Sequence, residues 1–180
     1  RAKRGTMTTK TKVPGAANSK PIEVLMSGKP LSAANRKAVR EFGESQIDQF
    51  MVAVGFKDPA GMTDNNGWRR LRLESAEGIA GIVENSDELY LHVEATVMPL
   101  PSDRDLIQAL MREALELNCT LPGAGSLGIR GTQLVASATE NLRTLHSPRA
   151  YGTLIHSVMA VANAFDDGLK EKYGGTTKTR

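Results

Sequence analysis

The sequence predicts an α+β domain in which an antiparallel sheet of about five strands carries helices packed on it, in the order α-βββ-α-ββ-α. Two observations lead to this prediction. Stretches with apolar residues every three or four positions, typical of helices, are separated by stretches in which apolar and polar residues alternate, as they do in strands. The connections within each group of strands are also short, which favours antiparallel pairing.

The chain has 180 residues, 40% of them hydrophobic, which is enough for one domain with a substantial core. We expect this domain to cover residues 32–174, after a basic flexible tail over 1–31 and before a short tail over 175–180. The first segment has seven Lys or Arg against Glu23 alone, a net charge of +6, whereas residues 32–174 have a net charge of −5. No apolar run reaches the ~20 residues of a membrane helix and no signal segment opens the sequence, so we expect a cytoplasmic protein.

The first predicted helix begins after Ser32, whose hydroxyl suits an N-cap, and ends at Gly55. Just before it lies the short apolar stretch PIEVLM, residues 21–26. This stretch either packs on the domain as an arm or pairs with a partner as a strand, and the residues leave both interpretations open.

Three strands are predicted next. The first starts near Trp68, the second is GIAGIVE over residues 78–84 after a turn at Glu77-Gly78, and the third covers residues 89–97. Apolar residues occupy every second position of the third strand. The sheet is therefore expected to have one buried face and one polar face.

A second helix is predicted to start at Ser102, which forms a capping box with Asp105, and to end at Asn118 in a left-handed conformation. The stretch LPGAGSLGIRG that follows, residues 121–131, contains glycines with the spacing G-x-G-x-x-G. This loop follows a helix and precedes a strand, the reverse of a dinucleotide site, so we interpret its glycines as architectural.

The last two elements are a hairpin that turns at Gly131-Thr132 and a long helix. Ser147 caps this helix, Pro148 suits its first turn, and Gly174 closes it.

The side chains that could do chemistry form no recognised catalytic set. The three histidines lack metal-ligand spacing, the single cysteine is interpreted as a buried thiol, and the acidic pairs fall on helices, where we expect them to face solvent. We therefore expect no enzyme, no metal and no cofactor. The residues in question are His92, His146, His156, Cys119, Glu113, Glu116, Asp166 and Asp167.

A resemblance to a known family covers Val97 to Ser137, VMPLPSDRDLIQALMREALELNCTLPGAGSLGIRGTQLVAS. This run is similar to the central segment of the YbjN-like family and of the related Tir-chaperone fold of type III secretion chaperones. In those proteins a strand ends in a Pro-containing turn, a helix ends in a Leu-Asn motif, and a Gly-containing loop leads to a hairpin before the last helix. The element order extends the resemblance from about residue 33 to 173.

The resemblance implies a bacterial, non-enzymatic protein that dimerises and holds an extended partner segment against apolar surface and sheet edge. The basic leader is a departure, since the compact chaperones generally lack it.

We thus predict a chaperone-like or regulatory protein-binding module that forms a homodimer. Its candidate contact residues are Ile22, Val24 and Leu25 in the arm and Trp68, Arg70 and Arg72 on the first strand. The alternative is a nucleic-acid-associated regulator, because clustered cations bind polyanions. Its basic residues would be Lys3, Arg4, Lys10, Lys12 and Lys20.

Overall fold

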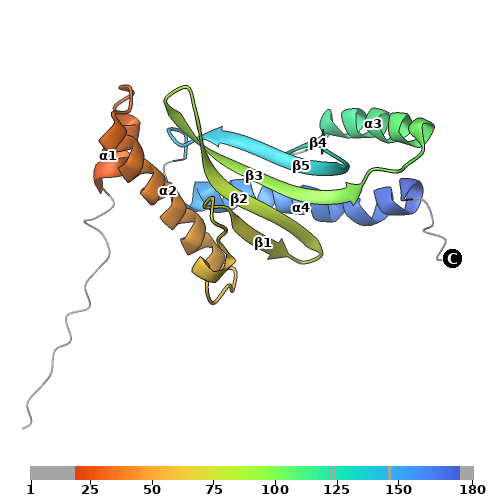
Figure 1. Ribbon diagram of the computed structural model, residues 1–180, viewed down its shortest axis with the longest axis horizontal. Coiled ribbons are helices and arrows are strands. Elements are labelled where there is room, and N and C mark those ends of the chain that lie inside the picture. The colour runs from red at the N-terminus through yellow and green to blue at the C-terminus, as the bar shows by residue number, and fades with distance from the viewer. Residues whose placement is uncertain (1–18, 122, 124, 146, 175–180) are drawn as a thin grey trace, which may run out of the picture.

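The computed structural model describes residues 19–174 except 122, 124 and 146, and it arranges them in layers (Figure 1). A five-stranded antiparallel sheet with the order β1-β2-β3-β5-β4 lies along the long helix α4. The predicted fold class and order are confirmed, with a short helix α1 and a 3₁₀ turn η1 in addition. The elements are α1 Ser19–Met26, α2 Ala33–Ala53, η1 Ala60–Met62, β1 Arg69–Leu73, β2 Ala76–Asn85, β3 Glu88–Pro99, α3 Arg104–Asn118, β4 Ser126–Arg130, β5 Gln133–Asn141 and α4 Pro148–Tyr173.

Helices α2 and α4 start where the sequence predicts. The Ser32 hydroxyl accepts a hydrogen bond from the backbone N–H of Asn35 at 3.3 Å, and the Ser147 hydroxyl accepts one from Ala150 at 3.3 Å. These bonds satisfy donors that the first turn of a helix leaves free. No helix among the described residues is long and apolar enough to cross a membrane.

The sheet has one face under the helices and one open face. Side chains on β3 alternate between the two faces, as expected from the two-residue period of a strand. The buried set faces α4 and includes Leu89, Leu91, Val93, Ala95 and Val97, all at most 1% exposed. The open set is Tyr90, His92, Glu94 and Thr96.

The predicted turn at Glu77-Gly78 is wrong, because β1 and β2 are joined at Glu74-Ser75 and Gly78 lies inside β2. A Cβ at Gly78 would lie 2.5 Å from the carbonyl oxygen of Glu94 and 2.9 Å from the sulfur of Met159. The glycine is there because β3 and α4 approach closely, not because the chain turns.

The N-cap of α3 is Asp103 rather than the expected Ser102. Its carboxylate accepts hydrogen bonds from the backbone N–H groups of Asp105 at 2.8 Å and Leu106 at 3.0 Å. A carboxylate at this end also interacts favourably with the helix dipole.

Asn118 ends α3 without a left-handed conformation and has a different role. Its side-chain Nδ2 donates to the carbonyl oxygen of Leu127 at 2.9 Å, and the Leu127 N–H donates to Oδ1 at 2.7 Å. The amide thus makes the pair of bonds that a neighbouring strand would make with β4.

The packed part of the chain begins before Ser32, within the segment expected to be a tail. Helix α1 lies against α2, and Leu25 and Leu31 are only 3% and 5% exposed. The Arg143 guanidinium donates to the carbonyl oxygens of Leu25 at 3.0 Å and Lys29 at 2.7 Å, and its Nε donates to Glu88 at 2.8 Å. PIEVLM is therefore a docked helix, which excludes the strand interpretation for this conformation.

Candidate functional site

Strand β1 forms one edge of the sheet, and part of its outer side is open. A two-residue turn closes on a hydrogen-bonded pair, here Leu73 with Ala76, and such pairs alternate along antiparallel strands. The backbone groups of Trp68, Arg70 and Arg72 therefore point away from β2.

The first of these outward positions is occupied, and the second is occupied in part. The Trp68 carbonyl oxygen accepts from the Asp64 N–H at 2.9 Å, and the Trp68 N–H donates to the Asp64 carboxylate at 3.0 Å. Apart from an isolated bridge between Thr63 and Arg69, no strand among the described residues pairs with this side of β1. Because the bridge between Thr63 and Arg69 uses the outward backbone groups on either side of Arg69, the N–H of Arg70 faces η1. The carbonyl oxygen of Arg70 and the backbone of Arg72 are thus placed to receive another strand.

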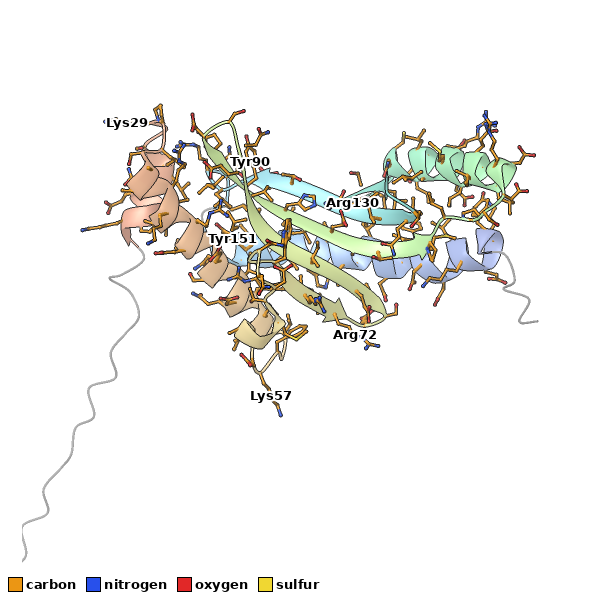
Figure 2. The ribbon with its side chains drawn as sticks, viewed as in Figure 1. Lys29, Lys57, Arg72, Tyr90, Arg130 and Tyr151 are labelled. Carbon is orange, nitrogen blue, oxygen red and sulfur yellow. The ribbon has the colours of Figure 1, made fainter. Side chains whose placement is uncertain are left out.

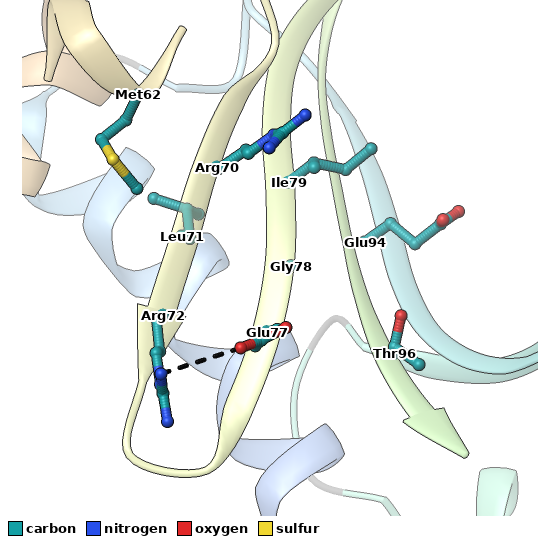
Figure 3. A pocket seen from close by; sticks show the side chains of 9 residues that line it. All are labelled: Met62, Arg70, Leu71, Arg72, Glu77, Gly78, Ile79, Glu94 and Thr96. Atoms are coloured by element: carbon teal, nitrogen blue, oxygen red, sulfur yellow. Dashed lines mark ion pairs between the residues drawn. The ribbon is translucent and has the colours of Figure 1, made fainter. Parts of the chain in front are cut away.

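The open face beside this edge is hollowed. A depression of about 610 Å³ extends over β1, β2 and β3, and Figure 3 shows the side chains around it. Arg70 lies opposite Ile79 in the register, and Arg72 lies opposite Glu77, with 3.9 Å between the charged atoms. Met62 borders the depression from η1.

Trp68 forms a fixed end to this surface. Its ring covers Gly81, where a Cβ would lie 2.7 Å from the indole, and it meets the His92 ring edge-on with 5.7 Å between centroids. Trp68 is half-buried and held against β2 and β3, so it does not line the depression and is not free to act as an anchor.

The charged groups deeper on the open face are paired. His92 Nδ1 lies 2.7 Å from the Thr139 hydroxyl, its Nε2 lies 3.8 Å from Glu94, and Glu94 forms an ion pair with Arg130. Burial lowers the pKa of His92, so its imidazole is neutral at pH 7, although Glu94 opposes the shift. Glu94 and Arg130 are thus paired with each other, the buried Nε2 of His92 has no hydrogen-bond partner among the described residues, and the three groups form no nucleophile and base set.

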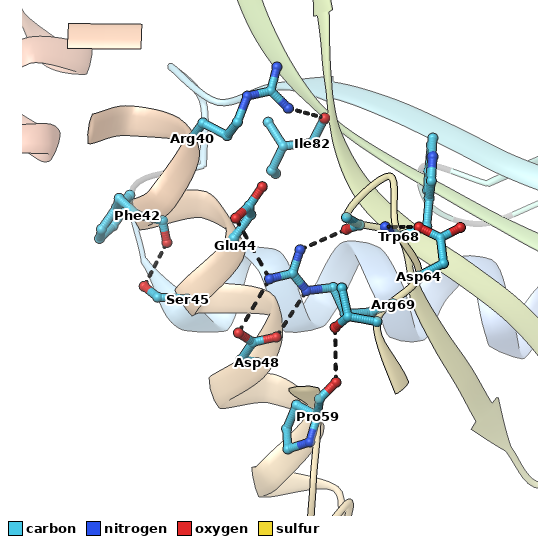
Figure 4. Close-up of polar contacts among 12 residues, drawn as sticks. Arg40, Phe42, Glu44, Ser45, Asp48, Pro59, Asp64, Trp68, Arg69 and Ile82 are labelled. Atoms are coloured by element: carbon cyan, nitrogen blue, oxygen red, sulfur yellow. Dashed lines mark hydrogen bonds and ion pairs between the residues drawn. The ribbon is translucent and has the colours of Figure 1, made fainter. Parts of the chain in front are cut away.

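Arg69 lies on the opposite face and anchors β1 to α2. Its guanidinium donates to both carboxylate oxygens of Asp48, at 3.0 Å and 3.3 Å, and to the carbonyl oxygen of Gly67 at 2.7 Å (Figure 4). Glu44 lies 3.8 Å away, and Arg69 is only 6% exposed. This fork fixes the start of β1 and leaves the open edge to Arg70 and Arg72.

Helix α4 holds the other end of β1. The Ser75 N–H and hydroxyl both donate to Asn163 Oδ1, at 3.3 Å and 2.5 Å, and Asn163 Nδ2 donates to Glu74 at 2.6 Å. The carboxylate of Asp166 lies 3.2 Å from the same hydroxyl. Asp166 is 4% exposed, so the expectation that it faces solvent is wrong. The turn bonds to α4 because both carry short polar side chains at their contact.

A second depression, of about 350 Å³, lies on the helix face next to the same edge. Its apolar lining comes from Val54, Leu73, Met159 and Ala160. The edge of β1 therefore has a hollow on each side of the sheet.

The other predicted residues lie elsewhere. Ile22 and Val24 are half-buried on α1, Leu25 is buried, and α1 lies by the start of α2, away from β1 (Figure 1). The structure therefore does not bring the two predicted groups together, and it makes Leu25 a core residue. Lys20 is exposed on α1. Lys3, Arg4, Lys10, Lys12 and His146 lie outside the described residues.

Sequence reasoning missed Met62, Ile79 and the α4 residues of the second hollow, since only packing brings them to β1. Cys119, expected to be buried, is exposed. Among the described residues no group of three or more His, Cys, Asp or Glu could hold a metal ion.

Helix α3 and strand β4 form a separate apolar surface. Met111 and Leu115 lie one turn apart on α3, beside the stripe formed by the buried Leu110 and Ala114, and Leu115 is 66% exposed. On β4, Ile129 is 42% exposed. Large apolar side chains exposed together mark contact surfaces.

Comparison with known proteins gives no match to any family profile and none to a curated protein sequence. Solved structures do match. A chain of the ExsC–ExsE complex superimposes with a TM-score of 0.52 at 12% identity, over 72% of this chain and 95% of that one. A chain of the HopA1–SchA chaperone–effector complex gives 0.50 at 14% identity, over 69% and 92%. The chain has the fold of type III secretion chaperones.

This chaperone fold accounts for most of each neighbour and leaves more than a quarter of the present chain unmatched. The Yersinia pestis type III secretion chaperone SycH, solved with a fragment of YscM2, matches with a TM-score of 0.48 at 11% identity, over 68% of this chain and 98% of that one. The alternative of a nucleic-acid-associated regulator gains no support from these neighbours, and the YbjN-like resemblance stays a prediction.

Proposed function

We propose that the chain is a non-enzymatic, chaperone-like module of the cytoplasm that holds an extended segment of a partner protein along the outer edge of β1. The observation that carries this proposal is the open edge itself, where the backbone groups of Arg70 and Arg72 point outward between two hollows. Added strands gain affinity from backbone hydrogen bonds and specificity from pockets for alternate side chains. Neighbours solved in complex with partner proteins support the same role.

A proline at residue 72 tests the proposal. Arg72→Pro removes an N–H that points away from β2, and proline is tolerated on an edge strand at such a position. Arg72→Ala removes the same side chain and keeps the N–H. The tagged full chain and both variants would be used to capture partners from the source cells at high salt with nuclease, followed by mass spectrometry.

We expect a partner that the wild-type chain and Arg72→Ala retain and that Arg72→Pro loses. Retention by all three proteins would refute strand pairing at β1. Capture that disappears with nuclease or high salt would instead favour nucleic-acid binding, because phosphate contacts weaken steeply as salt rises.

We also propose that a second copy of the chain covers the surface of α3 and β4. Leu115→Glu places a charge in this surface and is expected to convert the dimer to a monomer in light scattering. Val52→Glu is the matched control, since Val52 on α2 is 59% exposed against 66% for Leu115. A wild-type monomer at micromolar concentration, or dissociation by both variants, would contradict the assignment of this interface.

A further inference from the structure

The two hollows beside β1 lie on opposite faces of the sheet, so a strand added at this edge would direct alternate side chains into each. Thr63 and Asp64 already contact the start of β1 as far as the N–H of Arg70, which leaves the Arg70 carbonyl oxygen and residues 71–73 as its open part. The added segment is therefore short, about three to four paired residues. Its recognition depends on which side chains suit each hollow.

On the open face the added segment would meet two arginines. Arg72 points away from the body (Figure 2), and its contact with Glu77 joins two side chains that are about 70% exposed and 3.9 Å apart. Such exposed pairs contribute little stability. Arg70 is exposed and has no ion pair within the part of the chain that the structure describes. Both guanidinium groups are thus available to carboxylates on a neighbouring strand.

The nearest acidic group does not neutralise these arginines. Glu94 borders the same hollow, but its carboxylate is paired with Arg130 and is only 15% exposed. A basic side chain on the added strand would meet Arg70 and Arg72 directly, and like charges opposite each other are unfavourable.

The hollow on the helix face is lined mainly by apolar side chains, in contrast to the charged side chains on the open face. Leu73, Met159 and Ala160 provide apolar surface. Of the polar side chains that line it, Glu74 and Asn163 bond to each other, and His156 is exposed on α4 beside the apolar surface. An apolar side chain is the one that gains here, because it removes apolar surface from water on both sides.

We propose that the segment recognised at β1 alternates acidic and apolar residues, with the acidic side chains beside Arg70 and Arg72 and the apolar ones over Leu73, Met159 and Ala160. This inference rests on the proposed function, to which it adds the chemical class of the partner. Arg70 and Arg72 are then the residues that determine specificity, and the backbone edge provides affinity.

Three labelled synthetic peptides with the same Gly-Ser flanks test the inference by fluorescence anisotropy with the full chain. One alternates Glu and Val, one alternates Lys and Val, and one has the same Glu and Val residues in two separate blocks. The alternating Glu–Val peptide is expected to bind about tenfold more tightly than the Lys–Val peptide, because two opposite-charge pairs replace two like-charge contacts. The block peptide is expected to lose most of this affinity, since it places the wrong side chain in each hollow.

Charge-reversal variants test whether Arg70 and Arg72 cause the preference for the Glu–Val peptide. The double variant Arg70→Glu/Arg72→Glu is expected to prefer the Lys–Val peptide. The matched control is Lys37→Glu/Lys57→Glu, which makes the same change in net charge at exposed positions outside β1, α3 and β4 and is expected to keep the preference for Glu–Val.

The outcomes separate this inference from the proposed function. Equal binding of the Glu–Val and Lys–Val peptides, both lost in Arg72→Pro, would overturn the inference and leave strand pairing intact. Binding of Glu–Val that persists in Arg72→Pro would overturn strand pairing at β1. Failure of all three peptides to bind would overturn the inference, and the capture experiment would decide the proposed function.

Discussion

Replacement of Asn118 by alanine tests the role assigned to its amide. The side chain makes two hydrogen bonds to the backbone of Leu127, at 2.9 Å and 2.7 Å, and Leu127 is 6% exposed. A hydrogen bond contributes about 1 kcal/mol net, and a buried group left without a partner costs about 1–3 kcal/mol. We therefore expect Asn118→Ala to lower the free energy of unfolding by about 2–4 kcal/mol.

For a domain of this size that loss corresponds to a decrease in Tm of roughly 6–12 °C. Circular dichroism melts and urea titrations of the full chain measure it. Asn65→Ala is the control, because Asn65 is exposed and its side chain makes no hydrogen bond within the described ranges; its stability is expected to stay within about 0.5 kcal/mol of wild type.

Asn118→Asp refines the test. At pH 7 the carboxylate can accept from the Leu127 N–H but cannot donate to its carbonyl oxygen, so most of the loss is expected to remain. A protonated carboxyl group can both donate and accept a hydrogen bond, so the difference in the free energy of unfolding between Asn118→Asp and wild type should decrease as the pH is lowered. A loss below about 0.5 kcal/mol for Asn118→Ala would refute the assigned role.

Three further predictions follow from other contacts. Gly78→Ala should destabilise the fold by about 1–3 kcal/mol in urea titrations, since its methyl group would meet the Glu94 carbonyl oxygen. Gly128→Ala is the control and should keep the wild-type stability, because no atom lies within 4 Å of the added Cβ. Arg143 holds the pKa of Glu88 below its usual 4.5, so the ion pair stabilises the fold above that pH. The difference in the free energy of unfolding between wild type and Glu88→Gln should therefore disappear as the pH falls below 4.5, and a difference that grows in acid would contradict this. Cys119 is exposed in the single chain and lies one turn after Leu115, so the proposed dimer should protect its thiol, and Leu115→Glu should react with a thiol reagent faster than wild type; equal rates would contradict that interface.

Local signals in the sequence predicted most of the secondary structure. Ser32 and Ser147 were identified as caps because a cap depends only on the next turn of its own helix. The strand from Glu88 to Pro99 was identified because alternation directly reflects the buried and open faces of a sheet. In β1 the arginines Arg70 and Arg72 alternate in the same way with Leu71 and Leu73, and they lie on the open face.

Contacts between distant residues account for the errors. Gly78 was interpreted as a turn residue because nothing near it in the sequence indicates that Met159 packs against it. Asp166 was expected to face solvent because Ser75, whose hydroxyl contacts its carboxylate, is 91 positions away in the sequence. The hollow on the helix face could not be predicted either, since its residues come from three separate elements.

The contact of Arg143 with α1 has a consequence for the synthesis of the chain. Leu25 and Arg143 are separated by 118 positions. At translation rates of about 5–20 residues per second, Arg143 is made roughly 6–24 s after Leu25. Helix α1, with 8 residues, is too short to be stable by itself and has no completed docking site during that interval. Helix α1 is therefore made well before the residue that completes its docking site, and until Arg143 is made its apolar side is accessible to ribosome-associated factors.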